Sequence, residues 1–582
     1  MNIKAYCPKP KRMKLFLTFQ FNVSNSLWYI TFRGRCEPFV KIFSLLRFPE
    51  GVAKREKISA MKRLMFCLIP VFGCLALLAQ RPVSWPTWGG DPQRTGWQKS
   101  ETKLAAGSLS NVRLLWKMKL ENEPKALHAL HEPLILGNII TPHGFKELAI
   151  VAGSDDNIFA IDADLGRIVW KRHFQVPPPN DGRGPHWLCP GGLTATPVIS
   201  QPAGRGGPPT TPTLYAIASD GMLRQINLAN GEDLAPPVPF VPKGNGKPYS
   251  LNLVDGVLYT ATGQGCGQVP NGVYALNLSD PAKKVSKFET GSGGIWGLAG
   301  SAMSTDGGTL YAETGDGTYD PASSRYANAF VALGAKDLKL KDWYAPTNWE
   351  WIYKRDLDMN VTPVVFPFHG RDLIAGAGKE GRIYLLDSKS LGGNDHQTPL
   401  YRSPLIANED VNFQSQGIWG ALATWEAEGT RWLLAPVWGP KHPEFKYPVT
   451  NGGAPQGSIA AFKVEEQGGK TTLTPAWESR DVLSPTPPVI ANGIVWALAS
   501  GEYTQQSKLD ASPGLYSSED RAKLSSKAIL YALDAKTGKE LWSSGSAMNS
   551  FTHYYGLALA NGRVYVGTYD GTFYCFGVPM EH

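Results

Sequence analysis

Short apolar strands separated by glycine- and aspartate-rich turns recur along the chain, at intervals of about sixty residues. In the clearest copy, 528–542, an apolar run leads into an Asp-x-x-x-Gly turn and then into a second run that ends in tryptophan. The pattern returns at 157–170, and weaker copies lie at 222–231, 272–278, 329–333, 382–387 and 458–462. A pair of strands such as 562–568 precedes most copies, and Asp-Gly turns close the hairpins. Each unit is therefore predicted to form four antiparallel strands, which is one propeller blade.

The outermost strands predict the number of blades. These strands are expected to end near Trp116, Trp170, Leu234, Phe288, Trp343, Tyr401, Trp477 and Trp542. After Trp542 three strands remain, around 553–560, 563–568 and 572–576, and a lone strand at 111–116 precedes the first full unit. Together these four would complete a shared blade, so that the ring has no open end. The predicted fold class is all-β: an eight-bladed β-propeller of four-stranded antiparallel blades, closed by the N-terminal strand and the three C-terminal strands, with most tryptophans wedged between blades.

Composition agrees with this pattern. Glycine (62) and proline (45) are abundant among the 582 residues, and 11% of the chain is aromatic, which favours many short strands. The formal charge of +8 comes from the first 80 residues, which hold 14 Lys and Arg and 3 Asp and Glu. The rest of the chain holds 44 basic and 47 acidic residues. Because this body is nearly neutral, no nucleic-acid partner is expected.

The N-terminal region contains a pattern typical of a secretory signal. Met61-Lys62-Arg63 precedes an apolar run over 64–79 with a small residue near its end. We therefore expect a mis-called or non-structural extension at 1–60, a signal peptide at 61–80 and a single propeller at 81–582. A genuine basic extension ahead of an uncleaved anchor is the alternative. The predicted location is periplasmic or secreted. A lipoprotein site at 71–74 fits poorly, because Phe72 and an apolar run flank Cys74.

Three of the seven cysteines lie beyond the signal segment, at positions 189, 266 and 575. A Cys189–Cys266 disulfide would suit an oxidising compartment, and three buried thiols are the alternative. The sequence has no C-x-x-C-H, which excludes a covalently attached haem of that type.

The string Ala-Leu-Asp-Ala-Lys-Thr-Gly-Lys-Glu-Leu-Trp at 532–542 resembles the pyrroloquinoline-quinone (PQQ) repeat, and 85–97 is similar to the entry segment of such propellers. The resemblance spans roughly 85–577. The same blades build periplasmic quinoprotein alcohol dehydrogenases and non-catalytic scaffolds such as the propeller that serves outer-membrane β-barrel assembly. Two hypotheses follow. An enzyme would oxidise an alcohol or sugar hydroxyl and pass electrons to a separate acceptor, whereas a scaffold would bind protein or polysaccharide.

Alcohol oxidation through PQQ needs an aromatic face for the flat quinone, a cation beside its reactive carbonyl and a carboxylate that takes the alcohol proton. The resemblance implies these roles for three residues. Trp296, in Gly-Ile-Trp-Gly, would form the quinone floor. Lys379, in Gly-Lys-Glu-Gly, would supply the cation, and Asp356, in Arg-Asp-Leu-Asp, would be the catalytic base.

The family also uses calcium or a lanthanide ion, and the resemblance implies its ligands. Asp316 stands where the family has a metal-binding Asn, and Asp358 matches an additional ligand of the lanthanide-using members. Where the family has a Glu, Gln268 is the nearest match. The family's vicinal Cys-Cys roof over the quinone is missing.

Each of these residues also has a simpler interpretation. The aspartates and the lysine suit exposed turns, and Trp296 suits a wedge between blades. Four of the ten histidines could suggest a metal site but have no ligand spacing, and they are predicted to be loop residues: His128, His131, His186 and His553. Three further tryptophans are predicted to be structural: Trp419, Trp432 and Trp438.

Overall fold

The computed structural model describes residues 3–6, 14–17, 83–176, 188–200, 211–242, 244–508, 514–553 and 555–580. The chain divides into two compact units, Met1–Arg81 and Pro82–His582. In the first unit, β1 (Ile3–Tyr6) pairs antiparallel with β2 (Lys14–Leu17). The predicted signal segment lies outside the described residues, so export and the position of the mature N-terminus stay predictions.

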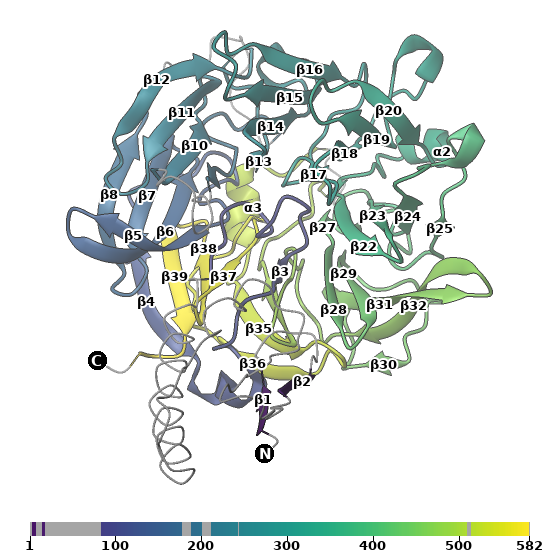
Figure 1. Ribbon diagram of the computed structural model, residues 1–582. Helices are drawn as coiled ribbons and strands as arrows, with labels where there is room; N and C mark the ends of the chain where they lie inside the picture. Colours follow the sequence, from purple (N-terminus) through teal and green to yellow (C-terminus); the bar gives the residue numbers. More distant parts are fainter. Residues whose placement is uncertain are drawn as a thin grey trace, which may run out of the picture. The chain divides into compact units, whose positions relative to one another are not determined.

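The second unit is an eight-bladed propeller of four-stranded antiparallel blades (Figure 1). The first blade in chain order consists of β5 (Leu134–Thr141), β6 (Gly144–Gly153), β7 (Asn157–Asp162) and β8 (Arg167–His173), and the second of β9 (Val198–Ile199), β10 (Thr213–Ile217), β11 (Met222–Asn227) and β12 (Asp233–Pro239). The third blade consists of β13 (Asn252–Val254), β14 (Val257–Thr262), β15 (Gly272–Asn277) and β16 (Val285–Glu289), and the fourth of β17 (Ala302–Met303), β18 (Thr309–Thr314), β19 (Ala329–Gly334) and β20 (Leu340–Tyr344).

The next three blades are β22 (Val364–Phe368), β23 (Arg371–Ala377), β24 (Ile383–Asp387), β25 (Tyr401–Arg402); β28 (Ala423–Ala427), β29 (Thr430–Trp438), β31 (Gly457–Gln467), β32 (Lys470–Glu478); and β33 (Val489–Ala491), β34 (Ile494–Ala499), β35 (Ile529–Asp534), β36 (Glu540–Ser543). Short strands extend some of these sheets: β3 (Trp97–Gln98), β21 (Val361–Thr362), β26 (Gly417–Ile418), β27 (Gly420–Ala421) and β30 (Val449–Thr450). Among the described residues, helices are few and short, namely α2 (Trp349–Tyr353), α3 (Ser518–Leu524) and 3-10 turns such as η3 (Cys266–Gln268). None of the helices in the described part of the chain has the length and hydropathy that a bilayer crossing requires.

The last blade joins the two ends of the propeller, as predicted. β37 (Ala558–Ala560), β38 (Arg563–Gly567) and β39 (Thr572–Gly577) form a sheet with β4 (Arg113–Lys119), and Cys575 pairs with Trp116 in its register. Each of the eight residues predicted to mark an outermost strand lies in one. Ring closure therefore depends on contacts between residues more than 400 positions apart.

The repeat sequence explains how neighbouring blades dock. The indole N–H of Trp116 donates to the Ala163 carbonyl in the Asp-x-x-x-Gly turn of the next blade, at 2.9 Å, and Trp477 does the same with Ala535 at 3.1 Å. Gly166 closes the first of these turns at φ +60°, and a Cβ there would lie 2.6 Å from the Trp116 ring. The turn therefore requires glycine both for its left-handed backbone and for the ring packed against it. These tryptophans are wedges between blades, as expected.

The N-terminal girdle, Trp85–Gln98, runs along the inner strands of the ring. Its main-chain atoms and the side chain of Gln98 form hydrogen bonds with one residue on each innermost strand: Ile135, Ile199, Asn252, Met303, Val365, Thr424, Ile490 and Leu559. These residues belong to β5, β9, β13, β17, β22, β28, β33 and β37, one strand from each blade. The girdle therefore ties every blade to one short segment.

Arg94 anchors the girdle from a fully buried position. Its guanidinium donates hydrogen bonds of 2.7–3.2 Å to the Thr87 hydroxyl and to carbonyl oxygens of Trp88, Leu251, Ala299 and Ser301. Burial lowers the pKa of Arg94 to about 10, so the group still carries its charge at neutral pH.

Replacing Arg94 with Met should therefore destabilise the fold strongly. Several buried carbonyl oxygens would lose their donor, and we expect the free energy of unfolding to fall by about 3–5 kcal/mol. Urea unfolding of the purified protein measures this. Arg113→Met, at an exposed position on the outer strand β4, is the matched control and should change little. Equal unfolding midpoints for the two variants would contradict the anchoring role.

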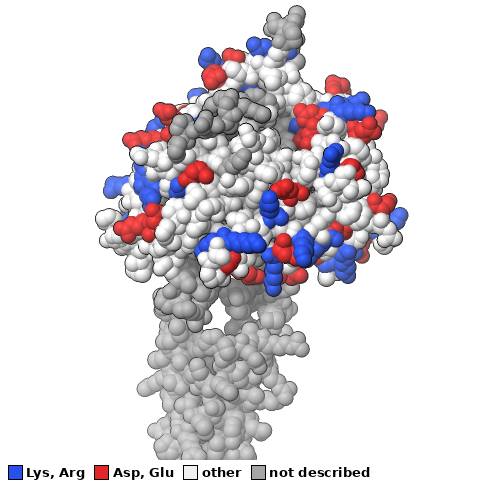
Figure 2. All heavy atoms as spheres, turned by 90° about the horizontal axis from the view of Figure 1, so that it is seen from above, with Lys and Arg blue, Asp and Glu red and all other residues white. Residues whose placement is uncertain are grey.

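The surface of the ring carries mixed charge. Figure 2 shows basic and acidic side chains interspersed over the face that it displays, with apolar and neutral residues between them.

Candidate functional site

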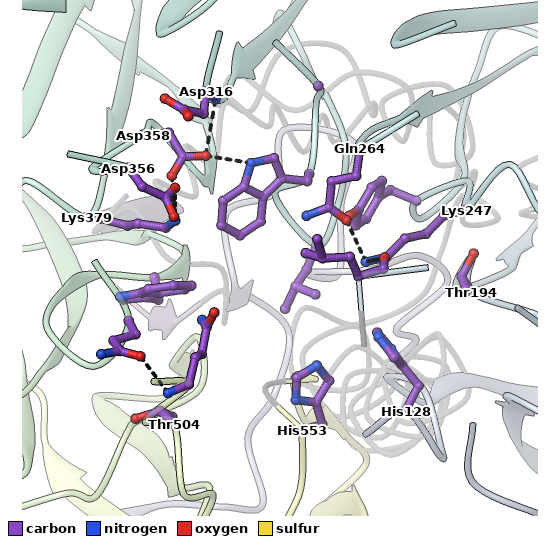
Figure 3. Close-up of a pocket in the computed structure, with 18 of the residues that line it drawn as sticks. His128, Thr194, Lys247, Gln264, Asp316, Asp356, Asp358, Lys379, Thr504 and His553 are labelled. Atoms are coloured by element: carbon purple, nitrogen blue, oxygen red, sulfur yellow. Dashed lines mark hydrogen bonds and ion pairs between the residues drawn. The ribbon is translucent and has the colours of Figure 1, made fainter. Parts of the chain in front are cut away.

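A cavity of about 300 Å³ lies on the axis of the propeller (Figure 3). Its lining residues come from two kinds of loop, those that precede an innermost strand and those that join the second strand of a blade to the third. All eight blades contribute, through residues such as His128, Thr194, Lys247, Trp296, Asp358, Trp419, Glu502 and His553. Because strands alternate in direction within a blade, both kinds of loop emerge on the same face of the ring.

One side of the cavity, here the acidic wall, consists of Asp316, Asp356, Asp358, Lys379 and Trp296. The Lys379 ammonium lies 2.9 Å from Asp356 Oδ1 and 2.7 Å from Asp358 Oδ1. It also lies 5.1 Å from the centre of the Trp296 ring. Asp358 Oδ2 accepts hydrogen bonds from Trp296 Nε1 at 2.8 Å and from the Asp316 main-chain N–H at 3.2 Å. The structure thus brings together five of the six residues singled out in the sequence, and their chemical roles stay predictions.

The sixth, Gln268, lies elsewhere. Its side chain is exposed in η3 and does not line the cavity. Gln264, in the same loop, lines it instead. Left-handed conformations at Gly265 and Gly267 turn the chain between these two glutamines.

The acidic wall carries more negative than positive charge. Burial, Asp358 and Asp356 raise the pKa of Asp316 to about 7. Burial also raises the pKa of Asp358, against the opposing effect of Lys379. Burial lowers the pKa of Lys379, but Asp358 and Asp356 outweigh it and raise this pKa above its ordinary value. Three carboxylates thus face one ammonium, and Asp316 Oδ1 is buried without a hydrogen-bond donor among the described residues.

Stacked indoles form a second part of the lining. Trp419 stacks on Trp438 with ring centres 4.5 Å apart and an interplanar angle of 10°, and the Trp296 ring meets Trp419 edge-on at 5.9 Å. The Lys379 ammonium lies 5.3 Å from the Trp419 ring centre as well. Trp419 and Trp438 were predicted to be merely structural, but both line the cavity.

Histidines line the opposite side. His553 Nδ1 lies 2.9 Å from both carboxylate oxygens of Glu502, and Arg521, on α3, donates to Glu502 Oε1 at 2.6 Å. These two partners lower the pKa of Glu502 although burial raises it. His128 Nδ1 lies 2.7 Å from the Tyr555 hydroxyl, and burial holds the pKa of His128 well below its usual range.

These histidines do lie in loops, as predicted, yet His128 and His553 line the cavity and their rings meet at 4.7 Å. His131 packs its ring against Tyr555, with ring centres 4.5 Å apart. Positions so far apart in the sequence gave no spacing signal that could have joined them. His186 lies outside the described residues.

Lys247 is a third feature that the sequence did not single out. Its buried Nζ donates hydrogen bonds to the Leu188 carbonyl at 2.6 Å and to Gln264 Oε1 at 2.9 Å. A Cys189–Cys266 disulfide, with a Cα–Cα distance of 5.5 Å, joins the two loops that carry these acceptors. The disulfide alternative is therefore the one adopted, and Cys575 is a buried free thiol.

Lys247 should make stability depend on pH. Burial lowers its pKa from 10.5 to about 7, so between these values the unfolded chain binds more protons than the folded one, and stability rises with pH. Relative to Lys247→Met, the free energy of unfolding of the unaltered protein should rise by about 1 kcal/mol per pH unit within this window. Urea unfolding at several pH values measures this, and parallel pH profiles for the two proteins would contradict it.

One protein family and several solved structures resemble this chain. Residues 525–578 match the sequence model of a family described as outer membrane protein assembly factor BamB. No curated protein sequence matches the chain.

Solved structures resemble the whole propeller. A quinohemoprotein alcohol dehydrogenase of Pseudomonas putida shares 14% identity, with 86% of this chain and 81% of that chain covered and a TM-score of 0.55. The corresponding enzyme of Comamonas testosteroni shares 15%, with 87% and 82% covered and a TM-score of 0.53. A europium-containing methanol dehydrogenase shares 11%, with 86% and 98% covered and a TM-score of 0.55. The chain is an eight-bladed propeller with the fold of the quinoprotein alcohol and methanol dehydrogenases.

Proposed function

We propose that the cavity binds PQQ together with calcium or a lanthanide ion, and that the protein oxidises an alcohol or sugar hydroxyl in the periplasm. Electrons would pass to a separate acceptor. One observation carries the proposal: Lys379 lies against the Trp296 ring while it bridges Asp356 and Asp358, in an axial cavity of about 300 Å³.

The lining suits a flat, anionic cofactor with a bound cation. Trp296 and Trp419 offer aromatic surface, and a cavity of this size is within the range of small-molecule sites. The surplus negative charge and the unpaired Asp316 Oδ1 favour a cation, which Asp316 and Asp358 would hold. PQQ would supply the two-electron acceptor, and the metal would polarise its carbonyl.

The described residues contain no group of three His, Cys, Asp or Glu side chains arranged to hold a metal by themselves. Two protein carboxylates alone would leave a hard cation short of ligands. Metal and cofactor binding should therefore depend on each other.

The remaining residues handle the substrate proton. The Asp356 side chain is 50% exposed, so its carboxylate can reach a hydroxyl that enters the cavity. Lys379 fixes the orientation of this carboxylate through the 2.9 Å contact. Asp356 would accept the hydroxyl proton, and the Lys379 ammonium would stabilise negative charge that develops beside it.

Titration of the exported protein with PQQ tests this proposal. Calcium or lanthanum is added, quinone absorbance reports binding, and alcohol-dependent dye reduction reports turnover. Binding should require the metal and should weaken in Asp358→Ala. Absence of PQQ binding with either metal would overturn the proposal.

A non-catalytic scaffold that binds protein or polysaccharide is the second candidate. Two observations favour it: Lys379 already forms ion pairs with both Asp356 and Asp358, and the matched family carries an assembly-factor description. In this case the ion pairs would serve only to hold the loops, and the same titration would show no metal-dependent PQQ binding.

A further inference from the structure

We propose that Lys247 is an amine nucleophile that forms an imine with an aldehyde or ketone entering the cavity. The site lies between the acidic wall and the histidines, where Figure 3 labels Lys247, Gln264 and His128.

The hydrogen bonds of Lys247 match those of a neutral amine. A lysine ammonium has three N–H donors, whereas a neutral amine has two N–H donors and one lone pair. Nζ has two acceptors, the Leu188 carbonyl at 2.6 Å and Gln264 Oε1 at 2.9 Å. Both acceptors are uncharged oxygens, so two N–H groups satisfy them and the lone pair is left over for reaction.

The surroundings of Lys247 also favour the neutral form. No carboxylate in the described part of the chain lies within ion-pair distance of Nζ, and burial alone accounts for its pKa of about 7. The Tyr249 ring lies 5.8 Å from Nζ, and His128, kept neutral by its own burial, lines the same cavity. Buried lysines with lowered pKa values are the ones that act as nucleophiles in proteins.

Lys379 provides a comparison within the same cavity. It is equally buried, but Asp356 and Asp358 contact its ammonium and keep it protonated. The cavity therefore holds two buried lysines: Lys379, whose ammonium is ion-paired, and Lys247, whose amine has no ion pair with a described residue. Only the second can attack a carbonyl.

The two acceptor loops hold the amine in place. The Cys189–Cys266 disulfide joins them, next to Leu188 and two residues beyond Gln264. Lys247 itself has a left-handed backbone, with φ 46°, and is 8% exposed. A fixed nucleophile loses little conformational entropy when it reacts.

The reaction needs no oxidant or cofactor. The Nζ lone pair attacks the carbonyl carbon to form a carbinolamine, and the carbonyl oxygen then leaves as water while a C=N bond forms. The amine's two protons leave with that water, and hydrolysis reverses the step. The inference is independent of the proposed function, because it requires neither PQQ nor metal.

Reductive trapping tests the proposal on the exported, disulfide-intact protein, free of PQQ and metal. Acetaldehyde and sodium cyanoborohydride are added at neutral pH, and peptide mapping locates the ethylated lysines over time. A lysine with a pKa near 7 is neutral more than a hundredfold more often at that pH than an exposed one, so we expect Lys247 to react at least about tenfold faster than Lys389. Lys379 should stay unmodified.

Lys247→Arg is the control variant, because it retains donors toward both acceptors but has no nucleophilic amine. It should lose the fast phase of ethylation while its exposed lysines react at the original rate. An unmodified Lys247, or one that reacts no faster than Lys389, would overturn the proposal whatever the result of the PQQ titration.

Discussion

Removal of residues 555–582 is expected to prevent the whole propeller from folding, not only its last blade. The deletion takes away β37, β38 and β39, so β4 loses its sheet partner β39 and the flanking blades expose their apolar faces. Open strand edges and an uncovered core favour aggregation. We expect an insoluble product, or a soluble one without a cooperative urea transition.

A shorter truncation is the control for this prediction. Residues 579–582 follow β39, and their removal leaves the closing sheet complete. This variant should unfold like the full chain. A soluble, cooperatively unfolding protein that lacks 555–582 would show that closure is not required.

The proposed function predicts that Asp356→Asn strongly reduces turnover and spares both the fold and PQQ binding. An amide keeps the shape of the side chain and can still accept a hydrogen bond from Lys379, and asparagine tolerates the left-handed backbone at this position, φ 51°. It cannot take up a proton at neutral pH, so a rate loss of about 10²–10⁴ is expected.

Dye reduction with saturating PQQ and metal measures the loss, and thermal unfolding checks the fold. Asp337→Asn, in an exposed turn of a neighbouring blade, should keep full activity. Unchanged turnover in Asp356→Asn would mean that another group accepts the proton, and it would leave the proposal of PQQ binding to be decided by the titration.

The blades were predictable because their determinants are local. A tryptophan in the outer strand of one blade packs against a turn glycine of the next blade at Gly166, Gly231 and Gly538, so the repeat pattern itself contains both partners of the contact. Closure of the ring was predictable because three strands follow the last full repeat unit and one strand precedes the first. The residues of the acidic wall were predicted from the resemblance to PQQ-repeat proteins. Trp296, Asp316, Asp356 and Lys379 each lie in a short segment that resembles a motif of that family.

The rest of the cavity has no such signal. Lys247 and His553 lie in irregular loops with no repeating pattern, and they line one cavity only because the ring closes. The glutamine facing the cavity is position 264 and not 268 because two left-handed glycines reverse the chain between them. Backbone turns of this kind shift a side chain to a different face without altering the motif around it.

The girdle also sets a limit on how this protein can evolve. Repeat proteins can gain or lose a unit by duplication or deletion, since each repeat contacts only its neighbours. Here successive girdle residues serve successive blades, with Pro86 bonded to β9, Gln93 to β22 and Gly96 to β33. If a ninth blade were added, the girdle would have no residue to form a hydrogen bond with its innermost strand. If a blade were lost, the girdle groups that bond to it would be buried without hydrogen-bond partners. The length of the girdle therefore matches the number of blades, and a change in blade number would need a matching insertion or deletion in the girdle, near the N-terminus.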